Sequence, residues 1–324
     1  MAEPSVVYIH ASAALGPNRD YLPAQRVRLS ADPTPSDLRE LTRRVLGQSL
    51  RQASHFVELA AIGARLCLER AGQAPPPATA VYLGTGLAEV RAGEALFKQV
   101  LPPGPGLASP FDFINATNNM AAFYVARLAG LVSRNLTLTL EQFSFEAALY
   151  LAWQDLRHGA APAALVGGVD ENSFPRANHL RLLPLRDDQV MGEGSAWLYL
   201  NGDPDGAIGE VLCVETLKTD GLGGAAWAQE LRQFVGAQFT PTVPVSLLPG
   251  YGLAPEETEA LTRALPGVML APYLDYCGCY PTAAAFGVAL QFDVPPAAPQ
   301  LWLHVNRDRR GQTRLIGVRR PAGC

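Results

Sequence analysis

Short strand-like segments alternate with longer helix-like segments along most of the chain, and this alternation constrains the fold more than any other feature. The strand-like segments are rich in Val, Leu and Ile, and segments of roughly 10–20 residues with helical periodicity separate them. Such alternation predicts βαβ units and a largely parallel sheet. We expect strands at residues 6–9, 80–83, 136–140, 164–169, 195–200, 209–217, 244–248, 268–271, 300–305 and 314–318.

The helices between these strands follow from the spacing of apolar residues and from capping signals. One helix is expected to start near Asp37, with Ser36 as its candidate cap, after a loop at 11–35 that is rich in Pro, Ala and Asp. Further helices are expected at 54–73, 121–131, 145–158, 225–235, 254–265 and 282–292.

Composition is that of an ordinary globular chain and excludes several classes of protein. Of 324 residues, 48% are hydrophobic and 17% are charged, so intrinsic disorder is not expected. The net charge of -4 offers no basic surface for nucleic acid, and no apolar run reaches the ~20 residues that a membrane span needs. The N-terminus lacks the pattern of a secretory signal. A cytoplasmic location with reduced thiols is therefore expected.

The cysteines predict neither a metal nor a cofactor site. Cys277 and Cys279 are the only two that lie close together, and Cys-Gly-Cys is too short for a zinc knuckle. No histidine lies near this pair in the sequence. Buried free thiols are the simpler interpretation.

Four motifs occur in a characteristic order. They are Gly-Thr-Gly-Leu at 84–87, Asn-Asn-Met-Ala-Ala at 118–122, Ala-Leu-Val-Gly-Gly-Val-Asp-Glu at 164–171 and Met-Gly-Glu-Gly-Ser-Ala at 191–196. Their order and spacing closely resemble the β-ketoacyl-acyl-carrier-protein synthases. The resemblance runs over most of the chain and is strongest between residues 81 and 200.

The resemblance implies an α/β protein with a thiolase fold. This fold has five layers, αβαβα, and two pseudo-symmetric halves, here in a trimmed form. We expect the halves at residues 1–204 and 205–324, packed as one compact unit.

The catalytic residues of the family are absent at the matching positions. Gln142 stands where the family has its nucleophilic cysteine. The stretch that matches the first histidine loop places Pro249 or its neighbour at that histidine, and the second loop places Gly278 there. The chain has five histidines, and none falls in either loop: His10, His55, His158, His179 and His304. A glutamine amide cannot form a thioester, and loss of groups that act as a unit removes nearly all of their catalysis.

The pattern is similar to that of chain length factors, the non-catalytic members of the family. This similarity implies a heterodimer with an active ketosynthase that acts on acyl carrier protein, and the trimmed form resembles subunits of aryl polyene-type biosynthesis. Leu87 matches a gate residue that points into the partner's acyl tunnel, and Arg91 and Ala95 are expected to follow on the same helical face. Asn118 and Met120 are expected at the dimer interface, where the strand at 136–140 would pair across the axis.

Other functions remain open from the sequence. The chain could be an active acyltransferase or hydrolase that uses Ser144, Tyr251 or Cys277, although no histidine is placed near them by the motifs. It could also be a malonyl-carrier-protein decarboxylase that uses Gln142, or a homodimeric acyl-binding protein. The ordinary interpretation of Gln142 is a buried amide that hydrogen-bonds to backbone.

Overall fold

A computed structural model describes residues 6–17, 28–29, 37–51, 53–102, 106–172, 183, 185–239, 243–293 and 299–320. Within these residues, ten strands form one continuous sheet with the order β3-β2-β4-β5-β1-β6-β10-β9-β7-β8. The strands are β1 (Val7–Leu15), β2 (Ala80–Gly84), β3 (Asn135–Leu138), β4 (Ala163–Asp170), β5 (Gly194–Asn201), β6 (Gly209–Leu217), β7 (Val245–Pro249), β8 (Met269–Leu270), β9 (Gln300–Arg307) and β10 (Thr313–Arg320).

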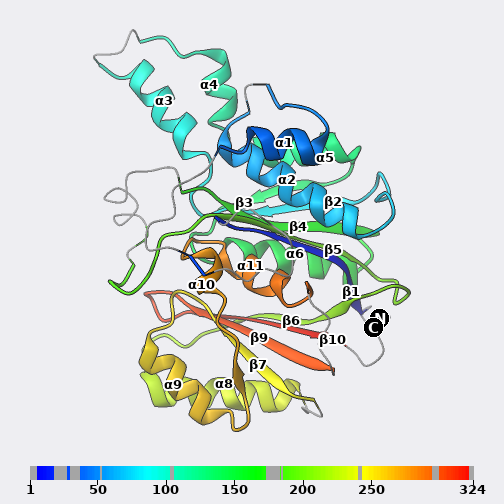
Figure 1. The fold of residues 1–324 in the computed structure, drawn as a ribbon. Coiled ribbons are helices and arrows are strands. Elements are labelled where there is room, and N and C mark those ends of the chain that lie inside the picture. Colours follow the sequence, from blue (N-terminus) through cyan, green and yellow to red (C-terminus); the bar gives the residue numbers. More distant parts are fainter. Residues whose placement is uncertain are drawn as a thin grey trace.

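Helices connect the strands and cover the sheet on both faces (Figure 1). They are α1 (Arg39–Leu46), α2 (His55–Arg70), α3 (Val90–Val100), α4 (Pro110–Asn115), α5 (Met120–Ala129), α6 (Ser144–Arg157), α8 (Gly224–Gln238), α9 (Pro255–Ala264), α10 (Leu274–Cys277) and α11 (Ala283–Leu290). None of these helices has both the length and the hydropathy that a membrane span requires.

The two halves of the chain repeat one topology. The first five strands have the order β3-β2-β4-β5-β1, and the last five have the equivalent order β8-β7-β9-β10-β6. The halves join where β1 and β6 pair antiparallel, from Val7 opposite Val211 to Ile9 opposite Gly209. This repeat agrees with two pseudo-symmetric halves, while a boundary at residue 204 stays a prediction.

The expectation of a largely parallel sheet was wrong. β2 and β7 are parallel to both of their neighbours, but β5 and β10 are antiparallel to both of theirs. In the second half the reason is plain, because only the short turn at residues 308–312 separates β9 from β10, and antiparallel strands need no crossover helix. Periodicity identifies strands without giving their direction.

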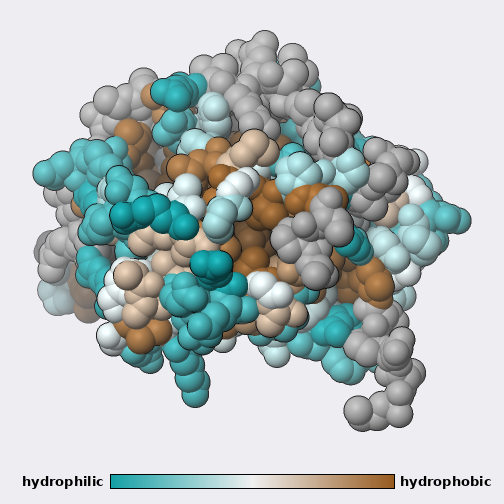
Figure 2. Space-filling view, turned by 90° about the horizontal axis from the view of Figure 1, so that it is seen from below, coloured by the Kyte–Doolittle hydropathy of each residue, from teal (hydrophilic) through white to brown (hydrophobic). Residues whose placement is uncertain are grey.

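Five layers follow from this arrangement and confirm the predicted fold class. In Figure 1, α2 and α5 lie above the strands of the first half, α6 and α11 lie in the middle, and α8 and α9 lie below the strands of the second half. Figure 2 looks from below, from the side of α8 and α9, and shows apolar residues near the middle of this face with hydrophilic residues around them.

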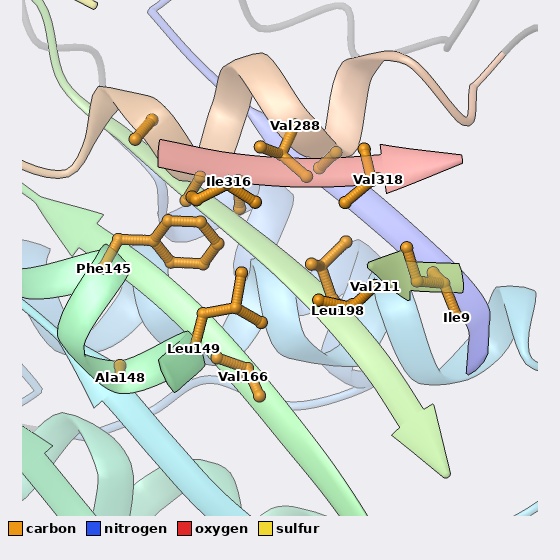
Figure 3. Packing of buried hydrophobic residues seen from close by; sticks show 14 of the residues in the cluster. Ile9, Phe145, Ala148, Leu149, Val166, Leu198, Val211, Val288, Ile316 and Val318 are labelled. Carbon is orange, nitrogen blue, oxygen red and sulfur yellow. The ribbon is translucent and has the colours of Figure 1, made fainter. Parts of the chain in front are cut away.

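The central core lies between the two halves of the sheet. Helix α6 contributes Phe145 and Leu149, and α11 contributes Val288, all fully buried. They pack with residues from both halves, such as Val166 of β4 and Ile316 of β10, in one cluster (Figure 3). Burying such side chains stabilises the fold by about 1.5–3 kcal/mol each, so the two halves depend on one another.

Two local expectations differ from the structure. Residues 11–15 were expected in a loop, but they continue β1, where Ala11, Ala13 and Leu15 are buried. The strand expected at 136–140 ends earlier: β3 covers Asn135–Leu138, lies at the edge of the sheet, and Leu136 is 38% exposed. Alternating small residues hide the first strand from periodicity, and sequence alone cannot distinguish an edge strand from a central one.

Gly84→Ala should destabilise the protein because the end of β2 touches the start of α6. A Cβ atom at Gly84 would lie 2.5 Å from the backbone oxygen of Ser144, closer than real Cβ contacts occur. We expect a loss of about 1–3 kcal/mol in the free energy of unfolding, measured by urea denaturation. Gly93→Ala, in α3, is the control because nothing lies within 4 Å of its Cβ position. Equal midpoints for the two variants would contradict this packing.

Candidate functional site

Gln142 lies in the tight turn between β3 and α6. Glu141, just before it, has a left-handed backbone with φ 47°. The Ser144 hydroxyl closes the turn, since it accepts a hydrogen bond from the Leu140 amide at 2.8 Å and donates one to the Glu141 carbonyl at 2.7 Å. The hydroxyl hydrogen of Ser144 is therefore engaged, and its side chain is fully buried.

The Gln142 side chain connects this turn to the turn after β9. Its Nε2 donates to the backbone oxygen of Arg307 at 2.6 Å, and Asn306 Nδ2 donates to the Gln142 carbonyl at 3.4 Å. Asn306 Oδ1 also accepts the Gly252 amide at 3.2 Å. Three segments that lie far apart in the sequence thus meet in one hydrogen-bonded group, and the Gln142 amide donates to backbone as its ordinary interpretation requires.

Arg307 is held in place from several sides. Its guanidinium pairs with Glu257, donates to the Leu222 carbonyl at 2.8 Å and lies 5.3 Å from the ring centre of Trp227. The backbone oxygen that receives Gln142 is therefore part of a fixed structure.

A cavity of about 520 Å³ opens beside Gln142. Its lining includes Leu87, Tyr251 and Pro281 and the charged residues Arg186 and Arg309. No cysteine or histidine occurs among the described residues that line it. The described part of the lining thus offers neither a thiol nor an imidazole to a substrate.

The two positions that match the catalytic histidines do not line this cavity. Pro249 ends β7, and its neighbours Tyr251 and Gly252 line the cavity instead. Gly278 packs against residues 191–192, where a Cβ atom would meet the Gly192 Cα at 2.6 Å. Its backbone has φ 75°, which favours glycine, so no histidine would fit there without a local rearrangement.

Asp170, at the end of β4, organises the turn on the opposite wall. One carboxylate oxygen accepts from the Gly86 amide at 2.9 Å, the Leu87 amide at 2.8 Å and Thr85 Oγ1 at 2.9 Å. The other oxygen accepts from the Thr282 amide at 3.0 Å and its hydroxyl at 2.8 Å. Burial raises the pKa of Asp170 to about 6, and these hydrogen bonds oppose that rise. Sequence reasoning missed this role, although a carboxylate directly after a buried strand was a usable signal.

Among the histidines that the structure describes, His304 lies in the buried core, which the motifs did not indicate. Its Nε2 is 3.0 Å from the Tyr273 hydroxyl. Burial lowers the pKa of His304 to about 3, so its imidazole is neutral. His304 is fully buried, Tyr273 is 1% exposed, and neither residue lines the cavity. The imidazole of His304 is therefore a base that a substrate in the cavity cannot reach.

The other candidate nucleophiles are poorly placed. Burial raises the pKa of Cys277 far above its ordinary value, and the thiol is fully buried. Burial likewise raises the pKa of Tyr251, and the charge of Glu146 adds to this effect. Thiols and phenols react as anions, so both groups are unreactive near neutral pH. Within the described residues, no group of His, Cys, Asp and Glu is arranged to hold a metal ion.

The predicted tunnel and interface residues lie on α3, on α5 and in the turns that precede these two helices. Leu87 precedes α3 and lines the cavity of its own chain, so the expectation that it shares a helical face with Arg91 and Ala95 was wrong. Ala88, with φ 59°, turns the chain between them. Arg91 is exposed and Ala95 is half-buried on α3, while Asn118 is exposed and Met120 starts α5 half-buried. Their roles stay predictions.

Glu146→Gln should stabilise the protein above neutral pH. Glu146 is fully buried in α6, neither carboxyl oxygen has a hydrogen-bond partner among the described residues, and burial raises its pKa from 4.5 to about 7. A raised pKa gives stability that is complete below pH 4.5 and is lost as the pH rises through about 7. The variant should gain about 2–3 kcal/mol near pH 8.5 and little near pH 5, by urea unfolding.

The exposed Glu230→Gln in α8 is the matched control for this variant. It should follow the wild-type stability at both pH values. If the curves of Glu146→Gln and Glu230→Gln run parallel across the pH range, the interpretation of Glu146 is wrong.

Comparison with known proteins agrees with this geometry. The family described as "Beta-ketoacyl synthase, N-terminal domain" matches residues 23–180. Comparison with curated protein sequences found no significant match.

Two solved structures have the same fold over almost the whole chain. One is the ishigamide ketosynthase/chain length factor, with a TM-score of 0.78 and 19% identity, covering 98% of this chain and 100% of that chain. The other is a type II PKS acyl-carrier protein in complex with its ketosynthase bound to the hexaketide, with a TM-score of 0.76 and 15% identity, again covering 98% and 100%. Residues 23–180 therefore match the N-terminal domain of β-ketoacyl synthases, in a chain that shares the fold of these two structures over almost its whole length.

Proposed function

We propose that this chain is a non-catalytic, chain length factor-like subunit of a heterodimeric β-ketoacyl synthase. The observation that carries the proposal is the cavity beside Gln142, whose described lining contains no thiol and no imidazole. The Gln142 amide nitrogen is moreover engaged with the Arg307 backbone. Condensation needs a nucleophile that accepts the acyl chain and donors that stabilise an enolate. A partner ketosynthase would supply both.

The surface supports a partner of this kind. Large apolar side chains are exposed along one stretch of the chain, from α3 to the turn after β3: Phe97, Val100, Leu101, Leu107, Phe111, Phe113, Ile114, Phe123, Val132, Leu136 and Leu140. The stretch ends at β3, which is an edge of the sheet with unpaired backbone groups. A ketosynthase subunit with the same fold could extend the sheet and cover these residues in one large apolar interface.

Residues near α3 would set the length of the product. We infer that Leu87, Arg91 and Ala95 border the partner's acyl tunnel, since the chain near α3 carries this exposed apolar surface. Side-chain bulk there would then limit chain length. Acyl chains would arrive on acyl carrier protein, and aryl polyene or related polyketide biosynthesis in the cytoplasm is the pathway that the sequence resemblance favours.

The alternatives lack support from the geometry. An acyltransferase or hydrolase would need Ser144, Tyr251 or Cys277, and each is buried or engaged. A decarboxylase that uses Gln142 would need its amide nitrogen free, but this atom donates to Arg307.

Co-expression with the ketosynthase encoded beside it tests the proposal. We expect the two chains to elute together as a heterodimer and to condense malonyl-carrier protein, whereas this chain alone shows no condensation or decarboxylation. The readout is carrier-protein mass with each protein alone and with both together. Turnover by this chain alone would overturn the proposal and direct attention to Ser144, Tyr251 and Cys277.

Leu136→Glu should weaken that heterodimer because it places a charge on the edge strand that would be buried. We expect the Kd to rise at least roughly tenfold, which corresponds to about 1.4 kcal/mol, in titrations with the partner subunit. Met269→Glu is the control, since Met269 is 52% exposed at the opposite edge of the same sheet. An equal effect of the two variants would argue against β3 as the site of pairing.

A further inference from the structure

Helices α3 and α4 form an arm that extends beyond the five layers of the body (Figure 1). This α3–α4 arm comprises residues 90–102 and 106–115. Its two helices pack chiefly against each other, and of the residues in these helices Ala92 alone is buried. A contiguous exposed apolar surface marks an interaction site. Six of the large apolar side chains of the arm are between 47% and 77% exposed: Phe97, Leu101, Leu107, Phe111, Phe113 and Ile114.

The side chain of Gln99, in the last turn of α3, joins the two helices. Its Oε1 accepts the backbone amide of Ser109, the N-cap of α4, at 2.7 Å. Its Nε2 donates to Oδ2 of Asp112, in α4, at 2.5 Å. The backbone oxygen of Gln99 also accepts the Gly106 amide at 3.0 Å. Because a backbone amide only donates and a carboxylate only accepts, the amide of Gln99 is satisfied at both ends in one orientation.

Helix α4 depends on such contacts because it is short and exposed. It has six residues, and none of them is buried. A helix of this length is not stable in water without contacts to other parts of the chain. Gln99 gives α4 an acceptor at its N-terminus and fixes the position of Asp112 relative to α3. The apolar side chains of the two helices are therefore held in one arrangement before a partner binds.

The charges of the arm cancel, and most of them have partners within it. Residues 90–115 contain four charged side chains, two positive and two negative: Arg91, Glu94, Lys98 and Asp112. Lys98 Nζ lies 2.8 Å from a carboxyl oxygen of Glu94, and Asp112 accepts from Gln99. Arg91 lies in the first turn of α3, at the base of the arm. A complementary surface on a partner is therefore apolar rather than strongly charged.

We propose that the α3–α4 arm is a preformed clasp, locked by Gln99, that packs against an apolar surface of the partner ketosynthase subunit. The lock is a property of this chain alone, whereas the identity of the partner rests on the proposed function. Position favours this partner, because the exposed apolar stretch continues from the arm through Phe123 and Val132 to β3, the edge where the partner would pair. Gln99 is then a positioning residue that acts through the apolar side chains it holds in place.

Substitutions at Gln99 test the lock while the apolar surface stays intact. Gln99→Met keeps the length and the helix propensity of the side chain but removes both of its hydrogen bonds. Gln99→Glu keeps an oxygen for the Ser109 amide and places a carboxylate against that of Asp112. Adding Asp112→Asn to Gln99→Glu reverses the direction of this hydrogen bond and should rescue the lock. Lys98→Gln, which breaks the exposed pair with Glu94, is the control.

Hydrogen exchange of the full-length chain without its partner measures the lock. The amides of Phe113 and Ala116 report on α4, since they bond to the carbonyls of Ser109 and Asp112. We expect Gln99→Met and Gln99→Glu to lower their protection factors about tenfold, and the double variant and Lys98→Gln to stay within about twofold of the wild type. Urea midpoints should not change, because the helices of the arm pack chiefly on each other. Equal protection of α4 in Gln99→Met and Lys98→Gln would overturn the lock.

Titration with the partner ketosynthase tests the clasp. We expect the Kd to rise about tenfold for Gln99→Met, chiefly through slower association, because the arm must then be ordered during binding. The double variant should return the Kd to near the wild-type value. Phe113→Glu leaves Gln99 in place and should raise the Kd at least as much, because a charge replaces an apolar contact. Lost protection of α4 with an unchanged Kd would overturn the clasp.

The outcomes separate the lock, the clasp and the function of the subunit. If the ketosynthase does not bind the wild type, the proposed function and the partner of the clasp both fail, while hydrogen exchange still decides on the lock. If the chain alone sediments as a homodimer that Phe113→Glu dissociates, a second copy covers the arm, which overturns its assignment to a partner subunit. A heterodimer whose Kd responds to neither Gln99→Met nor Phe113→Glu forms elsewhere on the surface, and it also contradicts the clasp.

Discussion

The buried carboxylate of Asp170 is the interaction on which the rest of the site depends. It accepts five hydrogen bonds, three from the turn that follows β2 and two from Thr282, which precedes α11. These partners come from the two different halves of the chain. A buried charge is tolerated only when it is well paired or hydrogen-bonded, so the halves must dock in one relation, and the cavity forms where they meet.

The turn at Gln142, which the sequence resemblance matches to the nucleophile turn of ketosynthases, connects distant segments of this chain. Gln142 donates to the Arg307 backbone, and Asn306 accepts the Gly252 amide, so these three segments are held together by hydrogen bonds. The hydroxyl of Ser144 closes the turn itself. The side chains of Gln142, Ser144 and Asn306 thus make hydrogen bonds within the chain, and this arrangement is consistent with the proposed non-catalytic role.

Much of the fold could be predicted from the sequence, but less of the site could. Buried elements with strong periodicity, such as α2 and β4, were placed within a few residues, and the motif order predicted the layers. The strand at residues 11–15 was missed because small residues hide its alternation. Strand direction and the position of His304 beside Tyr273 depend on contacts between distant segments. A local sequence pattern does not predict such contacts, since the burial of side chains and the pairing of strands arise only when the two halves pack.

The most direct test of the account is the location of the acyl chain in the assembled enzyme. The purified complex of this chain with its partner ketosynthase would be incubated with acyl-carrier protein, and the intact mass of each subunit would then be measured. The account predicts an added acyl mass on the partner subunit alone, with this chain at its unmodified mass. An acyl adduct on this chain would contradict the claim that its site is non-catalytic.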